Sequence, residues 1–163
     1  MKNVVVTGMG VISCIGSGLN EVVSSLKSGK SGIKSNPTYK EMGFRSHVSG
    51  SIDINLSELI DRKVLRFMSE ASGFAYLAAQ EALINAGLDL SSIDTSRIGI
   101  IAGSGGASSA AQIEASDIAR TKGPKRIGPY AVTKTMGSTV SAILGTTLKL
   151  KGVNYSISSA CST

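Results

Sequence analysis

Apolar positions recur at helical spacing in four segments of the chain. These segments are 19–28, 59–86, 107–119 and 138–148. In each of them the apolar residues fall three or four positions apart, so they line one face of a helix. Gly29 and Gly87 follow the first two segments and are good helix stops. The second segment leaves room for a break near Ser69 or Ser72.

Three short apolar runs without a helical period predict buried strands. They are 4–7, 97–102 and 153–158. The polar, glycine-rich segment 29–57 predicts a long excursion with one short strand pair, and the two prolines in 121–129 predict a loop. Strands that are separated by helices and long connections are typical of an α/β protein with a mainly parallel sheet.

The composition agrees with a folded domain. Hydrophobic residues make up 42% of the 163 residues, which is enough for a core. No apolar stretch approaches the ~18 residues of a membrane span, and the apolar run near the start is too short for a signal peptide. We therefore expect no membrane association and a cytoplasmic location.

The charge balance restricts the possible partners. The net charge is +6, which could reflect only a solvated basic surface or could attract nucleic acid or an acidic protein. Aromatic residues are only 4% and Trp is absent, so a base-stacking surface is hard to build. We expect no nucleic-acid partner, whereas an acidic protein partner remains open.

Two glycine-rich stretches allow both a binding and a structural interpretation. Gly8-Met9-Gly10 follows a predicted strand, but the third glycine of a dinucleotide-binding turn is missing, so we favour a structural turn. Residues 103–106 (G-S-G-G) could cradle an anion with backbone N–H groups. Close packing of strand against helix is the interpretation that we prefer for this stretch.

The chain has two cysteines, Cys14 and Cys161, and one histidine, His47. Their number and spacing do not predict a metal site. His47 and Cys14 are expected to be structural. Cys161 follows a predicted strand and small residues, where a substrate could approach and a helix N-terminus would favour the thiolate. From spacing alone, a buried structural cysteine remains the stronger interpretation.

The end of the chain, N-Y-S-I-S-S-A-C-S-T, resembles the nucleophile motif of the β-ketoacyl-[acyl-carrier-protein] synthases. It is most similar to the type I chain-elongating enzymes of bacterial fatty acid synthesis. The resemblance covers the whole chain in order. The other matching blocks are V-V-V-T-G-M-G-V-I-S at 4–13, G-x-S-G-I at 29–33, R-S-H-V-S-G at 45–50, I-D-R-K-V-L-R-F-M-S at 60–69, I-A-G-S-G-G at 101–106 and G-P-Y-A-V-T-K-T-M at 128–136.

The resemblance implies a thiolase-like fold of two similar α/β halves in five layers, assembled as a homodimer. Cys161 matches the catalytic nucleophile, which takes the acyl chain before a decarboxylative condensation with malonyl-carrier protein. No cofactor is implied, because phosphopantetheine arrives on the carrier. The family's catalytic histidines and lysine belong to a second half. Residues 1–163 would be the N-terminal half, truncated just after the nucleophile and inactive alone.

The resemblance also implies further site residues. Two basic groups would receive the acyl carrier protein: the first basic group is Arg62, Lys63 and Arg66, and the second basic group is Lys122, Lys125 and Arg126. A solvated helix face is the alternative for the first. Gln112 and Met136 match positions near the acyl pocket, contributed across the dimer interface, although a helical Met usually belongs to the core.

Two alternative functions remain open at this point. One is a type II synthase or another thiolase-fold condensing enzyme. The other is a non-catalytic fragment that binds the carrier or dimerises.

Overall fold

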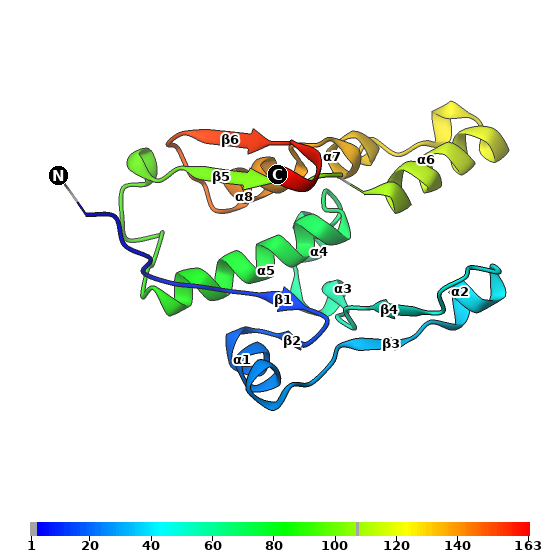
Figure 1. The fold of residues 1–163 in the computed structure, drawn as a ribbon. Coiled ribbons are helices and arrows are strands. Elements are labelled where there is room, and N and C mark those ends of the chain that lie inside the picture. The colour runs from blue at the N-terminus through cyan, green and yellow to red at the C-terminus, as the bar shows by residue number, and fades with distance from the viewer. Residues whose placement is uncertain (1–2, 107) are drawn as a thin grey trace.

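The computed structural model describes residues 3–106 and 108–163, which form layers around one long helix (Figure 1). The helices are α1 (Leu19–Ser28), α2 (Pro37–Glu41), α3 (Leu56–Leu59), α4 (Arg62–Leu65), α5 (Glu70–Asn85), α6 (Ser109–Lys122), α7 (Ala131–Thr135) and α8 (Thr139–Thr147). The strands are β1 (Ile12–Ser13), β2 (Gly16–Ser17), β3 (Ile33–Ser35), β4 (Val48–Gly50), β5 (Ile100–Gly103) and β6 (Asn154–Ile157). Short 3₁₀ turns are η1 (Thr95–Arg97), η2 (Pro124–Arg126) and η3 (Ala160–Ser162).

The described strands form three two-stranded sheets. β1–β2 and β3–β4 are antiparallel, and β5–β6 is parallel, with register from Ile100 opposite Asn154 to Gly103 opposite Ile157. A parallel pair needs a long crossover, and α6, α7 and α8 supply it. α8 packs on β5 and β6 and also on α5, so the parallel sheet and α5 lie on either side of α8.

α5 begins where the sequence leaves room for a break. Ser69 is its N-cap, and the Ser69 and Ser72 side chains each hydrogen-bond to the other's backbone N–H, which forms a capping box. Gly87 follows the helix at φ +64°, a left-handed conformation that glycine adopts without strain. The predicted helix over 59–86 is therefore three helices, with α5 as the long one.

The small hydrophobic core lies between α5, α8 and the α3–α4 segment. Ile60, Met68 and Ile143 are its buried members. The half-buried side chains packed on them are Leu56, Val64, Leu65, Phe67, Tyr76 and Leu77. The core therefore fixes α4, which carries the first basic group, against α5 and α8.

The other helical predictions hold with small shifts. The helix predicted over 19–28 is α1, and Gly29 ends it in the left-handed conformation. The helix predicted over 107–119 runs as Ser109–Lys122, while position 107 lies outside the described residues. The excursion over 29–57 contains the expected strand pair, β3–β4, joined by α2. The 121–129 segment contains η2 rather than a simple loop.

The strand predicted over 4–7 is wrong. No described strand pairs with this segment, and Val4, Val5 and Val6 are 98%, 72% and 81% exposed. The chain runs alongside α5 from Gly8 onward (Figure 1). Gly8 and Gly10 form no turn: they permit this contact, because a Cβ would lie 2.2 Å from the Ala82 carbonyl oxygen or 1.9 Å from that of Ala78.

The expectation that the other two strands are buried is also wrong. Ile101 in β5 is 70% exposed, and every residue of β6 is exposed. One face of this pair packs on α8, and no other described strand pairs with β5 or β6. Apolar residues in such strands indicate a surface that further structure covers, because isolated proteins rarely expose a continuous apolar patch.

A carboxylate holds the N-terminal segment on α5. Glu81 Oε2 accepts a hydrogen bond from Val11 N at 2.9 Å, and its Oε1 accepts one from Leu19 N at 2.6 Å. Leu19 is the first residue of α1, whose N-cap, Gly18, has no side chain to offer. Glu81 therefore caps α1 from a neighbouring helix.

Candidate active site

Cys161 lies in an exposed turn directly after β6. The chain leaves β6 at Ile157, and Ala160 has φ +49°, which is unusual for a residue with a Cβ. The turn is closed by Thr163 N donating to the Ala160 carbonyl oxygen at 3.3 Å and Ser159 N donating to Thr163 Oγ1 at 2.7 Å. The cysteine side chain is exposed, so the expectation of a buried structural cysteine is wrong.

The glycine-rich stretch after β5 packs against this turn. A Cβ on Gly103 would lie 2.6 Å from Thr163 Cγ2 and 3.1 Å from the Ile157 carbonyl oxygen. A Cβ on Gly105 would lie 3.1 Å from the Ala160 carbonyl oxygen. Close packing is therefore confirmed, but the partner is the Cys161 turn rather than a helix.

Cys14 has the structural surroundings that we expected, whereas the His47 side chain is exposed and its structural role stays a prediction. Cys14 is half-buried, and Cβ atoms on Gly32 or Gly50 would lie 2.7 and 2.9 Å from its sulfur. The backbone carbonyl of His47 accepts a hydrogen bond from Asn36 N at 2.7 Å, at the end of the β3–β4 pair next to α2. Across residues 3–106 and 108–163, no three His, Cys, Asp or Glu side chains gather as metal ligands do. No described helix has the length and apolarity to cross a membrane.

The first basic group lies on α4 and at its end. Arg62, Lys63 and Arg66 are all exposed. The Arg66 guanidinium carbon lies 4.9 Å from the ring centroid of Phe67 and 5.2 Å from that of Tyr130. None of the three residues forms a salt bridge with a described residue, so the positive charge is available to a partner.

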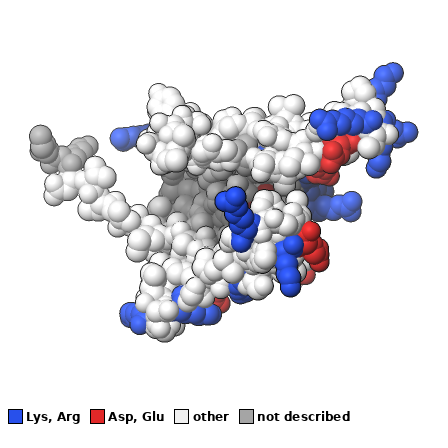
Figure 2. Space-filling model, turned by 45° about the vertical axis from the view of Figure 1, so that its right-hand side comes forward, with Lys and Arg blue, Asp and Glu red and all other residues white. Residues whose placement is uncertain are grey.

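The second basic group lies at one tip of the molecule. Lys122 is the last residue of α6, and Lys125 and Arg126 follow in η2. All three are exposed. Figure 2 shows Lys and Arg side chains gathered at this upper right-hand tip. Tyr130, the residue before α7, follows this group in the chain and contacts Arg66 of the first basic group.

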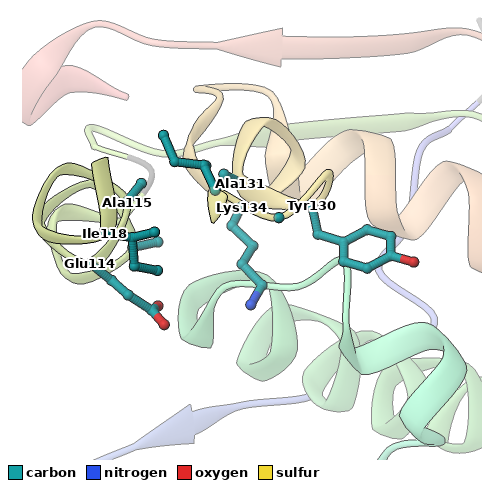
Figure 3. Close-up of a pocket in the computed structure, with 9 residues that line it drawn as sticks. Glu114, Ala115, Ile118, Tyr130, Ala131 and Lys134 are labelled. Atoms are coloured by element: carbon teal, nitrogen blue, oxygen red, sulfur yellow. The ribbon is translucent and has the colours of Figure 1, made fainter. Parts of the chain in front are cut away.

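The two predicted acyl-pocket residues have different surroundings. Met136, at the end of α7, lines an apolar pocket of about 370 Å³ together with Lys63, Val64 and Phe67. Gln112 is exposed on α6 and does not line this pocket. A second cavity, of about 160 Å³, lies between α6 and α7. In Figure 3 its walls include Glu114 and Ile118 from α6 and Ala131 and Lys134 from α7. The roles of Gln112 and Met136 remain predictions.

Sequence reasoning missed three features of these sites. The left-handed Ala160 has no local signal, because alanine has no preference for that conformation. Tyr130 lies 64 positions from Arg66, by the difference of their numbers, so no local pattern links them. Glu81 looks like any helical Glu in the sequence, and only the fold shows that it caps α1.

The fold defines the class of protein. The structure superposes on a β-ketoacyl synthase from Burkholderia phymatum with a TM-score of 0.82 over 99% of this chain and 40% of that one, at 24% identity. A ketosynthase/chain length factor gives 0.79 over 94% of this chain and 39% of the other, at 23% identity. These likenesses establish a thiolase-like ketosynthase fold.

The sequence then gives the family. Residues 1–163 match the family described as "Beta-ketoacyl synthase, N-terminal domain", and the chain belongs to it. It is 52% identical to 3-oxoacyl-[acyl-carrier-protein] synthase 1 of Haemophilus influenzae and 49% identical to that of Escherichia coli K12. Both matches cover 100% of this chain, which spans 40% and 41% of the two relatives.

Proposed function

We propose that this chain is the nucleophile-bearing half of a 3-oxoacyl-[acyl-carrier-protein] synthase that elongates fatty acids. The observation that carries the proposal is the exposed Cys161 on a closed, left-handed turn at the end of a parallel strand. The names of the two relatives support the substrate class. A type II synthase is the alternative, and the higher identities to proteins named synthase 1 favour type I.

The proposed reaction has two covalent steps. The Cys161 thiolate attacks the thioester carbonyl of the acyl carrier; the C–S bond to phosphopantetheine breaks, and the released pantetheine thiolate takes up a proton. Malonyl-carrier then loses CO₂, and its carbanion attacks the acyl-Cys161 carbonyl. A C–C bond forms, the Cys161 thiolate leaves, and the product is a 3-oxoacyl chain that is two carbons longer.

The proposed enzyme needs no cofactor of its own, because the pantetheine arm arrives on the carrier. It works as a homodimer in the cytoplasm. The groups that stabilise the carbanion come from a second α/β half. His47 lies on the β3–β4 arm, where its backbone carbonyl serves the fold, and it has no part in the proposed reaction. The 163 residues alone therefore form no 3-oxoacyl product.

We assign carrier docking to the two basic groups. Their six side chains are exposed, and the protein carries a net charge of +6, which favours an acidic partner. Complementary charge mainly accelerates encounter and fixes orientation. A solved type II polyketide ketosynthase that resembles this chain at a TM-score of 0.68 and 22% identity was captured with its acyl-carrier protein. That complex gives a precedent for a carrier on this fold.

Acyl transfer tests the nucleophile. The full-length protein is incubated with acyl-carrier protein and analysed by intact mass and peptide mapping. We expect one acyl group, on Cys161, and none in Cys161→Ala. Cys14→Ala is the matched control and should be acylated like the wild type. Acylation at Cys14, or none at all, would contradict the proposal, and 3-oxoacyl product from the 163-residue chain would contradict its expected inactivity.

Charge reversal tests the docking surface. Lys63→Glu with Arg66→Glu in the full-length protein should raise the KM for the carrier about tenfold or more, because two attractive charges become repulsive. Lys27→Glu with Lys30→Glu makes the same change in net charge at the end of α1 and should leave the KM close to the wild-type value. Equal effects of the two pairs would show that only net charge matters.

A further inference from the structure

One arginine of the first basic group differs from its neighbours in how it is held. The Arg66 guanidinium lies over two aromatic rings, 4.9 Å from the Phe67 centroid and 5.2 Å from the Tyr130 centroid. The two rings contact each other edge to face, with centroids 4.8 Å apart and planes at 78°. Arg62 and Lys63 have no described aromatic contact of this kind.

The aromatic pair joins two separate parts of the fold. Phe67 follows α4 and packs against the hydrophobic core, whereas Tyr130 is the residue before α7. Tyr130 also lines the cavity between α6 and α7, and in Figure 3 its ring points away from Glu114 and Ile118 on the other wall. Both rings are half-buried, while Arg66 is exposed. The two rings therefore form a fixed support under the Arg66 guanidinium, which faces solvent.

An aromatic support of this kind changes how an arginine can bind an acidic group. A guanidinium stacked on a ring keeps its in-plane N–H donors free, and those donors fit a carboxylate or phosphate in two-point contact. An unsupported surface arginine must lose rotamer freedom when it binds, and this loss weakens most exposed ion pairs. Arg66 has already lost part of that freedom in the free protein.

We propose that Tyr130 is a positioning residue for carrier recognition, which holds the Arg66 guanidinium over the Phe67–Tyr130 pair for two-point contact with an acidic group of the acyl carrier protein. The inference rests on the proposed function, and it adds a residue outside both basic groups. Tyr130 is the N-cap of α7 and Arg66 ends α4, so their contact links α7 to the first basic group.

A purely structural role for Tyr130 makes a different prediction. If the ring only packs α7 against α4, its loss will weaken carrier binding by the same factor whether or not Arg66 is present. If the ring acts through Arg66, its loss will matter only when the arginine is there. A double-mutant cycle separates the two cases.

The experiment measures the dissociation constant of the full-length protein for acyl carrier protein at low ionic strength. The variants are Tyr130→Leu, Arg66→Ala and the double mutant, with Tyr130→Phe as the conservative variant. Tyr130→Leu should weaken binding about twofold to fivefold, as expected for a partly exposed cation–π contact. The same change in the Arg66→Ala background should have no effect within error, and Tyr130→Phe should bind like the wild type.

A second cycle supplies the matched control. Tyr130→Leu combined with Lys125→Ala should be additive, because Lys125 is basic and nearby in sequence but does not stack on the ring. If Tyr130→Leu misfolds by circular dichroism, Tyr130→Met keeps the apolar volume without the ring face and replaces it in both cycles.

Three outcomes would overturn the inference. Tyr130→Leu could leave affinity unchanged, or it could weaken binding equally with and without Arg66. In both cases Arg66→Ala alone would still weaken binding, so the docking proposal would stand. If Arg66→Ala itself has no effect, then carrier docking at the first basic group fails together with the inference.

Discussion

Removal of the Glu81 carboxylate should destabilise the N-terminal part of the fold more than any other surface-charge change. Glu81 is half-buried on α5 and accepts backbone hydrogen bonds from Val11 at 2.9 Å and Leu19 at 2.6 Å. Without it, two N–H groups lose their partners and the N-terminus of α1 loses the cap that Gly18 cannot supply. Glu81→Ala leaves both donors unpaired, and Glu81→Gln can satisfy only one, because its NH₂ group would face the other donor.

The size of the effect follows from these contacts. A hydrogen bond to a charged group contributes about 1.5–3 kcal/mol, and solvent screening of a half-exposed carboxylate reduces each of the two to roughly 1–2 kcal/mol. The interaction with the N-terminal dipole of α1 adds about 0.3–1 kcal/mol. We therefore expect Glu81→Ala to lower the free energy of unfolding by about 2–5 kcal/mol, and Glu81→Gln to lower it by about half as much.

Equilibrium urea unfolding followed by circular dichroism measures this change. With a slope of about 2 kcal/mol per molar urea, the midpoint should fall by about 1–2.5 M for Glu81→Ala. Amide hydrogen exchange at Val11 and Leu19 should accelerate in both variants, which ties the loss to these two donors. Glu114→Gln is the control, since its carboxylate accepts no described hydrogen bond. Similar midpoints for Glu81→Ala and Glu114→Gln would refute the reasoning.

Three further predictions use other features of the structure. Gly10→Ala should cost about 1–3 kcal/mol of unfolding free energy in urea, since its Cβ would lie 1.9 Å from a backbone oxygen of α5, and wild-type stability would argue against that contact. Gly103→Ala should change the alkylation rate of Cys161 severalfold at an unchanged melting temperature, whereas Gly106→Ala, whose Cβ meets no described atom within 4 Å, should not. Ser96 donates hydrogen bonds to the Asp94 carboxylate from its side chain and from its backbone N–H. The side-chain bond has the larger effect, and together they lower the pKa of Asp94 below its usual 3.8. The ionised Asp94 therefore stabilises the fold above pH 3.8, and this stabilisation is lost as the pH falls through the lowered pKa. The unfolding free energy of Asp94→Asn should decline less steeply below about pH 4 than that of the wild type. Parallel curves of unfolding free energy against pH would contradict this prediction.

The longer helices could be predicted because their signals are local, whereas the short α2 and α7 were not predicted. The apolar spacing over 19–28 and the glycine after it determine α1 to the residue, and Ser69 has the side chain that an N-cap needs. A helix satisfies its own backbone, so periodicity and caps within about 15 residues suffice to identify it.

The strands could not be predicted in the same way, because a strand depends on partners elsewhere in the chain. The valines at 4–7 have high β-propensity, yet no described strand pairs with them. Their glycine neighbours Gly8 and Gly10 have the signature of a turn, but here they allow close approach to α5. Propensity indicated an extended segment and could not supply the hydrogen-bonding partner.

The candidate site was predictable only in part. Residue spacing alone favoured a buried cysteine, and the resemblance of the whole chain to a family gave Cys161 its proposed role. The exposed turn agrees with that role. The support of Arg66 by Tyr130 depends on a tertiary contact between α4 and the start of α7, so neither residue reveals it in the sequence.

The open parallel pair β5–β6 has a consequence for synthesis of the protein. Within the described residues neither strand has a second neighbour, and their outward face carries Ile101, Tyr155 and Ile157. A ribosome makes the chain from its N-terminus, so the unpaired edges of β5 and β6 emerge before any later segment could cover them. Substitutions that slow this covering should appear first as insoluble protein in the cell, and chaperone supply should rescue the yield before any purified enzyme shows a defect.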